Sequence, residues 1–162
     1  MLAECRDRIN SIALVHEMLY QSGTFSRIEF SDYLRSLGEQ VAHAWTRAAA
    51  QVQVHVEAED IALPLDTAIP CGLVINELLT NAFKHAFPGT RTGTIRVRVV
   101  RLGTRIHLSV EDDGVGMTSA TSGKGHIGLE LVHALARQLR GELQFNAERG
   151  TRVSLNFEGA QP

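Results

Sequence analysis

Alternating apolar and polar residues predict most of the strands of this chain. Val52, Val54 and Val56 alternate with polar neighbours, as in a strand with one buried face. The same alternation occurs over residues 95–99 and 106–110, and a turn containing Gly103 predicts that these two strands form a hairpin. Residues 142–147 and 151–157 are expected to form a second hairpin, and residues 27–30 a short edge strand.

Apolar residues at helical spacing predict four helices. These cover residues 2–20, about 31–47 with an N-cap at Ser31, about 66–87 with a cap at Asp66, and about 127–140 with Gly141 as the C′ residue. Helices and antiparallel hairpins that share one sheet predict an α+β fold, built as a two-layer sandwich. A domain boundary is expected near residues 23–26, so that residues 1–25 form one segment and residues 26–162 a domain.

Composition narrows the function classes. The formal net charge of −2 offers no basic field for nucleic acid or for an anionic membrane, so neither contact is expected. Cys5 and Cys71 lack metal-ligand spacing and are expected to be reduced, which favours a cytoplasmic protein. Apolar stretches such as residues 69–75 are too short to cross a bilayer, and the charged N-terminus is unlike a signal peptide.

The helix over residues 66–87 carries the first candidate site. Glu77, Asn81 and Lys84 stand at positions i, i+4 and i+7 and share one face, while another face can pack on the sheet. A carboxylate, an amide oxygen and an ammonium group together suit magnesium bound to a triphosphate. Taken alone, this segment fits a solvated polar face with a salt bridge equally well.

Three glycine-containing segments follow. Asp112, Gly114 and Gly116 come directly after a strand, where a carboxylate can accept a hydrogen bond from an amine such as that of adenine. A plain turn is the alternative, and a calcium loop is excluded because its alternating oxygen ligands are missing. Residues 123–128 match G-x-G-x-x-G before a helix, but a loop and not a strand precedes them, which argues against a dinucleotide-binding fold. Gly150 and Thr151 open the last strand, and alone they are typical of an ordinary hairpin turn.

In their order and spacing, these four segments resemble the N, G1, G2 and terminal Gly-Thr motifs of the GHKL ATPases, which include gyrase, the heat-shock chaperone and histidine kinases. The resemblance covers about residues 27–157. Residues 8–20 resemble the second dimerisation helix of a sensor histidine kinase class related to the HWE kinases. His85 follows the motif lysine as in HWE kinases, but their Trp-x-Glu pair is absent, since Trp45 is the only tryptophan.

This resemblance implies the ATP-binding catalytic domain of a two-component sensor histidine kinase. The fold would be a Bergerat-type sandwich, with helices on one face of a mixed, mostly antiparallel sheet. The implied roles are catalysis and Mg²⁺ binding by Asn81 and Glu77, phosphate contacts by Lys84 and His85, adenine recognition by Asp112 with Gly114, Gly116 and Thr151, and closure of a lid over ATP by Gly125 and Gly128. His126 replaces the second glycine usual in G2, and the lid is short.

The same resemblance implies partners and leaves two rival functions. A response regulator receiver domain would take the phosphoryl group, and the dimerisation helices would form a homodimer in the full protein. No phosphoacceptor histidine of the expected type is present, since His16 falls on the second helix and is expected to pack, so the chain is expected to be a fragment that does not phosphorylate itself. The rivals are a serine kinase of the anti-sigma-factor type and a non-catalytic ATP-binding or interaction module.

Overall fold

The computed structural model describes residues 27–45, 52–116 and 127–159, and the isolated positions 9, 13 and 17. Its elements, in chain order, are β1 (Arg27–Glu29), α2 (Phe30–Trp45), β2 (Val52–Ala58), β3 (Ala62–Pro64), α3 (Leu65–His85), β4 (Gly93–Leu102), β5 (Arg105–Asp112), α4 (Ile127–Gln138), β6 (Glu142–Asn146) and β7 (Thr151–Glu158).

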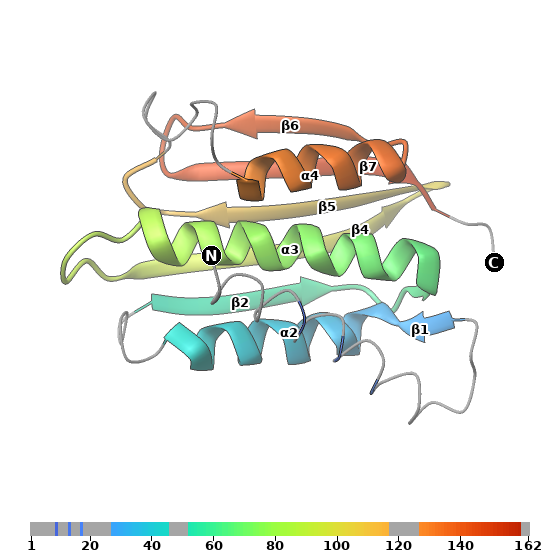
Figure 1. The fold of residues 1–162 in the computed structure, drawn as a ribbon, viewed down its shortest axis with the longest axis horizontal. Helices are drawn as coiled ribbons and strands as arrows, with labels where there is room; N and C mark the ends of the chain where they lie inside the picture. Colours follow the sequence, from blue (N-terminus) through green and yellow to red (C-terminus); the bar gives the residue numbers. More distant parts are fainter. Residues whose placement is uncertain are drawn as a thin grey trace.

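The main sheet has five strands in the order β2-β4-β5-β7-β6. Only the β2–β4 pair is parallel, and β4–β5, β5–β7 and β6–β7 are antiparallel. Helices α2, α3 and α4 lie side by side across one face of this sheet (Figure 1). β1 and β3 form a separate two-stranded antiparallel sheet. The predicted α+β sandwich, with helices on one face of a mostly antiparallel sheet, is confirmed.

The alternation in the strands places the core between the sheet and the helices. On β4, Ile95, Val97 and Val99 are fully buried, whereas Arg96 and Arg98 between them are exposed on the opposite face. β5 and β7 repeat this pattern, and α2 and α3 contribute buried side chains from the other layer. Burial of this apolar surface is the main favourable term that holds the two layers together.

Both predicted N-caps are wrong. α2 begins at Phe30, so Ser31 lies buried in its first turn, where its hydroxyl donates to Asp60 Oδ1 at 3.4 Å. α3 begins at Leu65, directly after β3, and its cap position is Pro64, which offers no side-chain hydrogen bond. Asp66 therefore lies in the first turn, where a carboxylate still favours the positive end of the helix. The three-residue strand β3, which fixes this start, was too short to be predicted from its pattern.

The C-terminal end of α4 also differs from the prediction. Arg140, and not Gly141, takes the left-handed conformation, with φ of 52°. The N–H of Gly141 donates to Ala136 O at 2.8 Å and that of Arg140 to Arg137 O at 3.0 Å, which is a Schellman arrangement with Arg140 at C′. Gly141 follows as C″, where the chain turns toward β6.

The predicted helix over residues 2–20 lies outside the described residues, except for Ile9, Ala13 and Glu17, which are helical and exposed. The predicted end of the second helix at residue 47 also lies outside them, since the description stops at Trp45. In the part of the chain that is described, no helix is both long and apolar enough to span a membrane.

Candidate functional site

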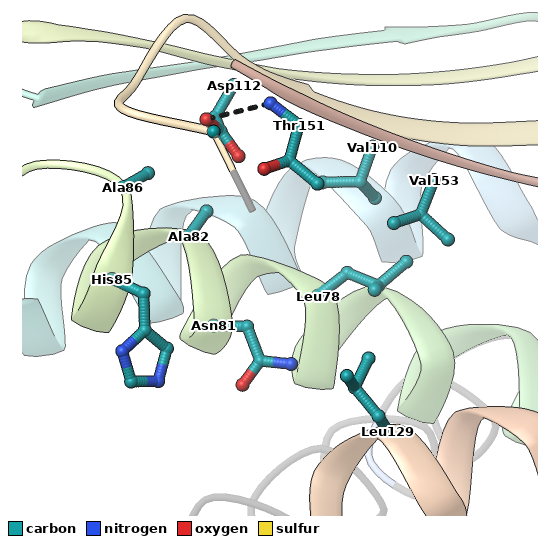
Figure 2. Close-up of a pocket in the computed structure, with 11 residues that line it drawn as sticks. Leu78, Asn81, Ala82, His85, Ala86, Val110, Asp112, Leu129, Thr151 and Val153 are labelled. Carbon is teal, nitrogen blue, oxygen red and sulfur yellow. Dashed lines mark hydrogen bonds between the residues drawn. The ribbon is translucent and has the colours of Figure 1, made fainter. Parts of the chain in front are cut away.

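A pocket opens between the C-terminal half of α3, the end of β5, the start of β7 and the start of α4 (Figure 2). Asn81, His85, Asp112 and Thr151 supply polar groups to its lining. The remaining lining residues are small or apolar, namely Leu78, Ala82, Ala86, Val110, Gly116, Leu129 and Val153. An apolar wall with a few polar groups is the usual composition of a small-molecule site.

Asp112 is the acidic group of this pocket. Its carboxylate is buried at the end of β5, and its Oδ1 accepts hydrogen bonds from the N–H groups of Gly114, at 3.0 Å, and Thr151, at 3.2 Å. The Thr151 hydroxyl also hydrogen-bonds this carboxylate. Because a carboxylate has about four acceptor positions, capacity remains for a ligand donor.

Burial raises the pKa of Asp112 above the ordinary value of an aspartate, since it penalises the charged form. The hydrogen bonds from Gly114 and Thr151 act in the opposite direction, and the neighbouring Asp113 carboxylate adds to the rise. The fold therefore places a desolvated acceptor against an apolar wall, where a single hydrogen bond to a ligand counts for more than it does in water.

The polar residues of α3 have different surroundings. Asn81 is half-buried and lines the pocket, and His85, one turn later, lines it from the same side of the helix (Figure 2). Lys84 is exposed and does not line the pocket. Glu77 is buried, so a solvated polar face does not describe this position.

Glu77 points toward the start of α4. A Cβ added at Gly128 would lie 2.7 Å from Glu77 Oε2 and 3.8 Å from Asn81 Oδ1. Real Cβ atoms do not approach an oxygen that closely, so a larger residue at position 128 would make the end of the Glu77 side chain turn aside. Gly128 does not line the pocket itself, but it brings α4 against the two oxygen-bearing side chains of α3.

The donor chemistry of Asn81 and Glu77 fits magnesium. Mg²⁺ prefers oxygen ligands and usually keeps several waters, so one or two protein oxygens plus substrate phosphates suffice. Asn81 carries an amide oxygen at the pocket, and the Glu77 carboxylate lies one helical turn before it. Among the described residues no cluster of three or more His, Cys, Asp or Glu side chains is suited to hold a metal ion.

The structure thus brings five of the predicted site residues together around one pocket: Asn81, His85, Asp112, Gly116 and Thr151. Gly114 lies behind them, where its N–H holds Asp112. Gly125 and His126, with the predicted lid, lie outside the described residues.

The sequence reasoning missed the apolar wall. Val110 and Val153 stand two residues from Asp112 and Thr151 on the same strands, so period two places them on the same face. Leu78 and Ala82 lie one turn apart on α3, on the side that faces the strands (Figure 2). That spacing was available in the sequence and would have identified the wall once the polar residues were chosen.

Two family models match this chain. One is described as histidine kinase-, DNA gyrase B- and HSP90-like ATPase and matches residues 67–161. The other is described as histidine kinase and matches residues 1–45.

Two curated relatives have similar sequences. Blue-light-activated histidine kinase 2 of Erythrobacter litoralis is 31% identical over 150 residues, which are 88% of this chain and 42% of the relative. Sensor histidine kinase PdtaS of Mycobacterium tuberculosis is 31% identical over 162 residues, covering 95% of this chain and 32% of the relative. The chain thus spans less than half the length of either protein.

Solved structures have the same fold. The histidine kinase domain of the Erythrobacter litoralis EL346 blue-light activated histidine kinase superposes with a TM-score of 0.87 at 26% identity, over 98% of this chain and 76% of that one. The catalytic domain of the histidine kinase ThkA gives a TM-score of 0.62 at 17% identity, over 84% and 96% of the two chains, which shows a shared fold alone.

Proposed function

Because this chain belongs to the family of histidine kinase-, DNA gyrase B- and HSP90-like ATPases, we propose that it is the ATP-binding catalytic part of a sensor histidine kinase. In this proposal it transfers the γ-phosphoryl group of ATP to a histidine, and a response regulator receiver domain takes the group next. The family membership confirms the resemblance found from the four motifs, in which each segment alone was ambiguous.

The proposal rests mainly on one observation: polar residues from three segments that are far apart in the sequence line the same pocket. Asn81, Asp112 and Thr151 come from α3, β5 and β7, and none is near another in the sequence. We propose that the adenine amine donates to the Asp112 carboxylate and that the base lies against the apolar wall of Val110 and Val153.

The triphosphate would extend toward Asn81 and His85, which lie on the same side of α3 (Figure 2). Asn81 would hold Mg²⁺, and Glu77 would support that site or orient the attacking group. When bound, Mg²⁺ would neutralise charge on the phosphate oxygens. Lys84 would add a positive charge from the rim, with Gly125 and Gly128 ending a lid over the phosphates.

The acceptor histidine is proposed to lie outside this chain, with His16 as a packing residue. The dimerisation helices would form a homodimer in the full protein, and the catalytic part would be cytoplasmic, where ATP is available. The boundary between residues 25 and 26 also stays a proposal. The histidine kinase match extends through α2 to residue 45, while α2 packs on β2 and α3.

Calorimetric titration with ATP and Mg²⁺ tests the proposal. We expect saturable binding that is lost in Asn81→Ala and retained in His16→Ala and in Asn146→Ala, an exposed asparagine on β6. Absence of binding by the unmodified chain would favour a non-catalytic module. In a separate phosphorylation assay, a phosphorylated protein that is stable to acid would favour the serine kinase, since phosphohistidine is acid-labile.

A further inference from the structure

This inference rests on the proposed function. We propose that Asp113 and Arg91, which do not line the pocket, are positioning residues for the adenine-reading loop. By holding this loop they would set the preference of the pocket for a 6-amino purine. The loop comprises residues 112–116. Both side chains are exposed.

Asp113 fastens the loop to the start of β4. Its N–H donates to Thr94 O at 3.3 Å, and its Oδ1 accepts the Thr94 N–H at 2.8 Å. The regular β4–β5 pairing ends at Ile95 and Asp112, so the backbone bond extends the ladder by one residue and the side-chain bond adds a second link at the same place. The residue that follows Asp112 is therefore fixed to the sheet on both its backbone and its side chain.

Gly93 provides the space for this contact. A Cβ at residue 93 would overlap both Asp113 Oδ1 and the Phe87 ring. The Asp113 carboxylate therefore occupies space that the side chain of any residue larger than glycine at position 93 would need.

Arg91 and α3 fasten the next residues. Arg91 Nη2 donates to the carbonyl oxygens of Asp113, at 3.2 Å, and Gly114, at 3.4 Å. The Val115 N–H donates to Ala86 O at 3.0 Å, just past the end of α3. With these bonds the loop is held from β4, from the α3–β4 connection and from α3. Its Gly114 N–H is thereby kept on Asp112 Oδ1, which orients the carboxylate.

Because these bonds lie at the surface, water can replace them when a side chain is removed, and the fold should lose little stability. Loss of orientation should instead appear in recognition of the base. A positioning role therefore predicts a change in the ratio of affinities for two bases, whereas a general loosening would weaken both ligands equally.

The test measures the Kd of ATP and of inosine triphosphate, which has a carbonyl oxygen in place of the 6-amine, by competition against a fluorescent ATP analogue. In Asp113→Ala and Arg91→Ala, we expect the preference for ATP over inosine triphosphate to fall by about three- to tenfold. Asp113→Asn, which keeps an acceptor for Thr94, should restore it. Asp32→Ala and Arg35→Ala, an exposed pair on α2, are the matched controls.

Arg91→Ala keeps the test decisive if Asp113→Ala does not fold. An unchanged affinity ratio in a folded variant, or an equal loss for both nucleotides, would overturn the inference while leaving ATP binding intact. If the unmodified chain bound neither nucleotide, the proposed function itself would fail.

Discussion

The Asp112 carboxyl is buried at the end of β5, and the protonation state that burial favours differs from the one that ligand binding favours. Burial opposes its charged form, yet the charged form is the stronger acceptor for a ligand amine. Asn at this position keeps an oxygen for Gly114 and Thr151 but presents an N–H₂ group as well.

Asp112→Asn should therefore weaken ATP binding without harming the fold. A hydrogen bond to a charged group contributes about 1.5–3 kcal/mol, so the Kd should rise by about 10- to 150-fold. The Tm of the ligand-free protein should stay the same or rise. Calorimetric titration and a thermal melt on the same sample measure both quantities, and wild-type affinity in this variant would exclude Asp112 as the base contact.

The raised pKa of Asp112 also predicts a pH dependence. A carboxyl whose folded pKa lies above its unfolded value, about 3.9, binds protons more tightly when folded. Its contribution to stability is greatest below about pH 4 and is lost as pH rises through the folded pKa. The free energy of unfolding of the wild type, relative to Asp112→Asn, should thus decrease from acid to neutral pH. Urea melts across this range test the sign, and an increase would contradict the burial argument.

Between elements, Gly128 is the point at which α4 comes close to the Glu77 side chain of α3. Gly128→Ala would place a Cβ 2.7 Å from Glu77 Oε2, inside the packed contact. Because Oε2 is the far end of a flexible side chain that can turn aside, we expect a loss of only about 0.5–1.5 kcal/mol in the free energy of unfolding. The double variant Glu77→Ala with Gly128→Ala should recover part of this loss, because the colliding carboxylate is gone. Additive effects in denaturant melts would show that the two residues do not meet.

The end of α4 offers an independent test of the backbone. Arg140 has φ of 52°, a conformation that costs a residue with a side chain about 1–2 kcal/mol. Arg140→Gly should raise the Tm by about 2–4 °C for a gain near 1 kcal/mol. Arg137→Gly, within the same helix, is the control and should lower it. A lower Tm in Arg140→Gly would contradict the left-handed assignment.

The elements that could be predicted well from the sequence are those in which buried and exposed side chains alternate regularly. β4, β5 and β7 each present a continuous apolar face, so their strands and the hairpin turn at Gly103 could be identified. The caps at Ser31 and Asp66 failed because β1 and β3 run straight into the helices. A strand was predicted over residues 27–30, but β3 was not, since its pairing partner β1 lies about 35 residues away in the sequence. Gly141 was misassigned because the left-handed C′ residue is usually a glycine, and nothing in the sequence indicates that Arg140 takes this conformation instead.

For the molecule as a whole, the order of the strands in the sheet could not be predicted from the sequence. The placement of β7 between β5 and β6 and the parallel pairing of β2 with β4 both involve strands that are not consecutive along the chain, and such pairings leave no local pattern. The site was predictable in part because its polar residues lie in recognisable segments. The burial of Glu77 was not, because it depends on where α4 docks.

The two faces of the sheet have different characters. The helix-covered face holds the core and the proposed ATP pocket, while the opposite face is lined by charged and polar side chains. There Arg152 pairs with Glu111 at 2.5 Å and Arg96 with Glu57 at 3.6 Å, over a groove that also includes Arg98. Exposed pairs of this kind contribute about 0–1 kcal/mol each, so they keep this face polar more than they stabilise it.

A crystal structure with a non-hydrolysable ATP analogue and Mg²⁺ would show directly where the nucleotide binds. We expect the adenine amine on the Asp112 carboxylate, the base against Val110 and Val153, and the metal beside Asn81. A nucleotide bound instead in the groove of Arg96, Arg98 and Arg152 on the open face of the sheet would contradict it.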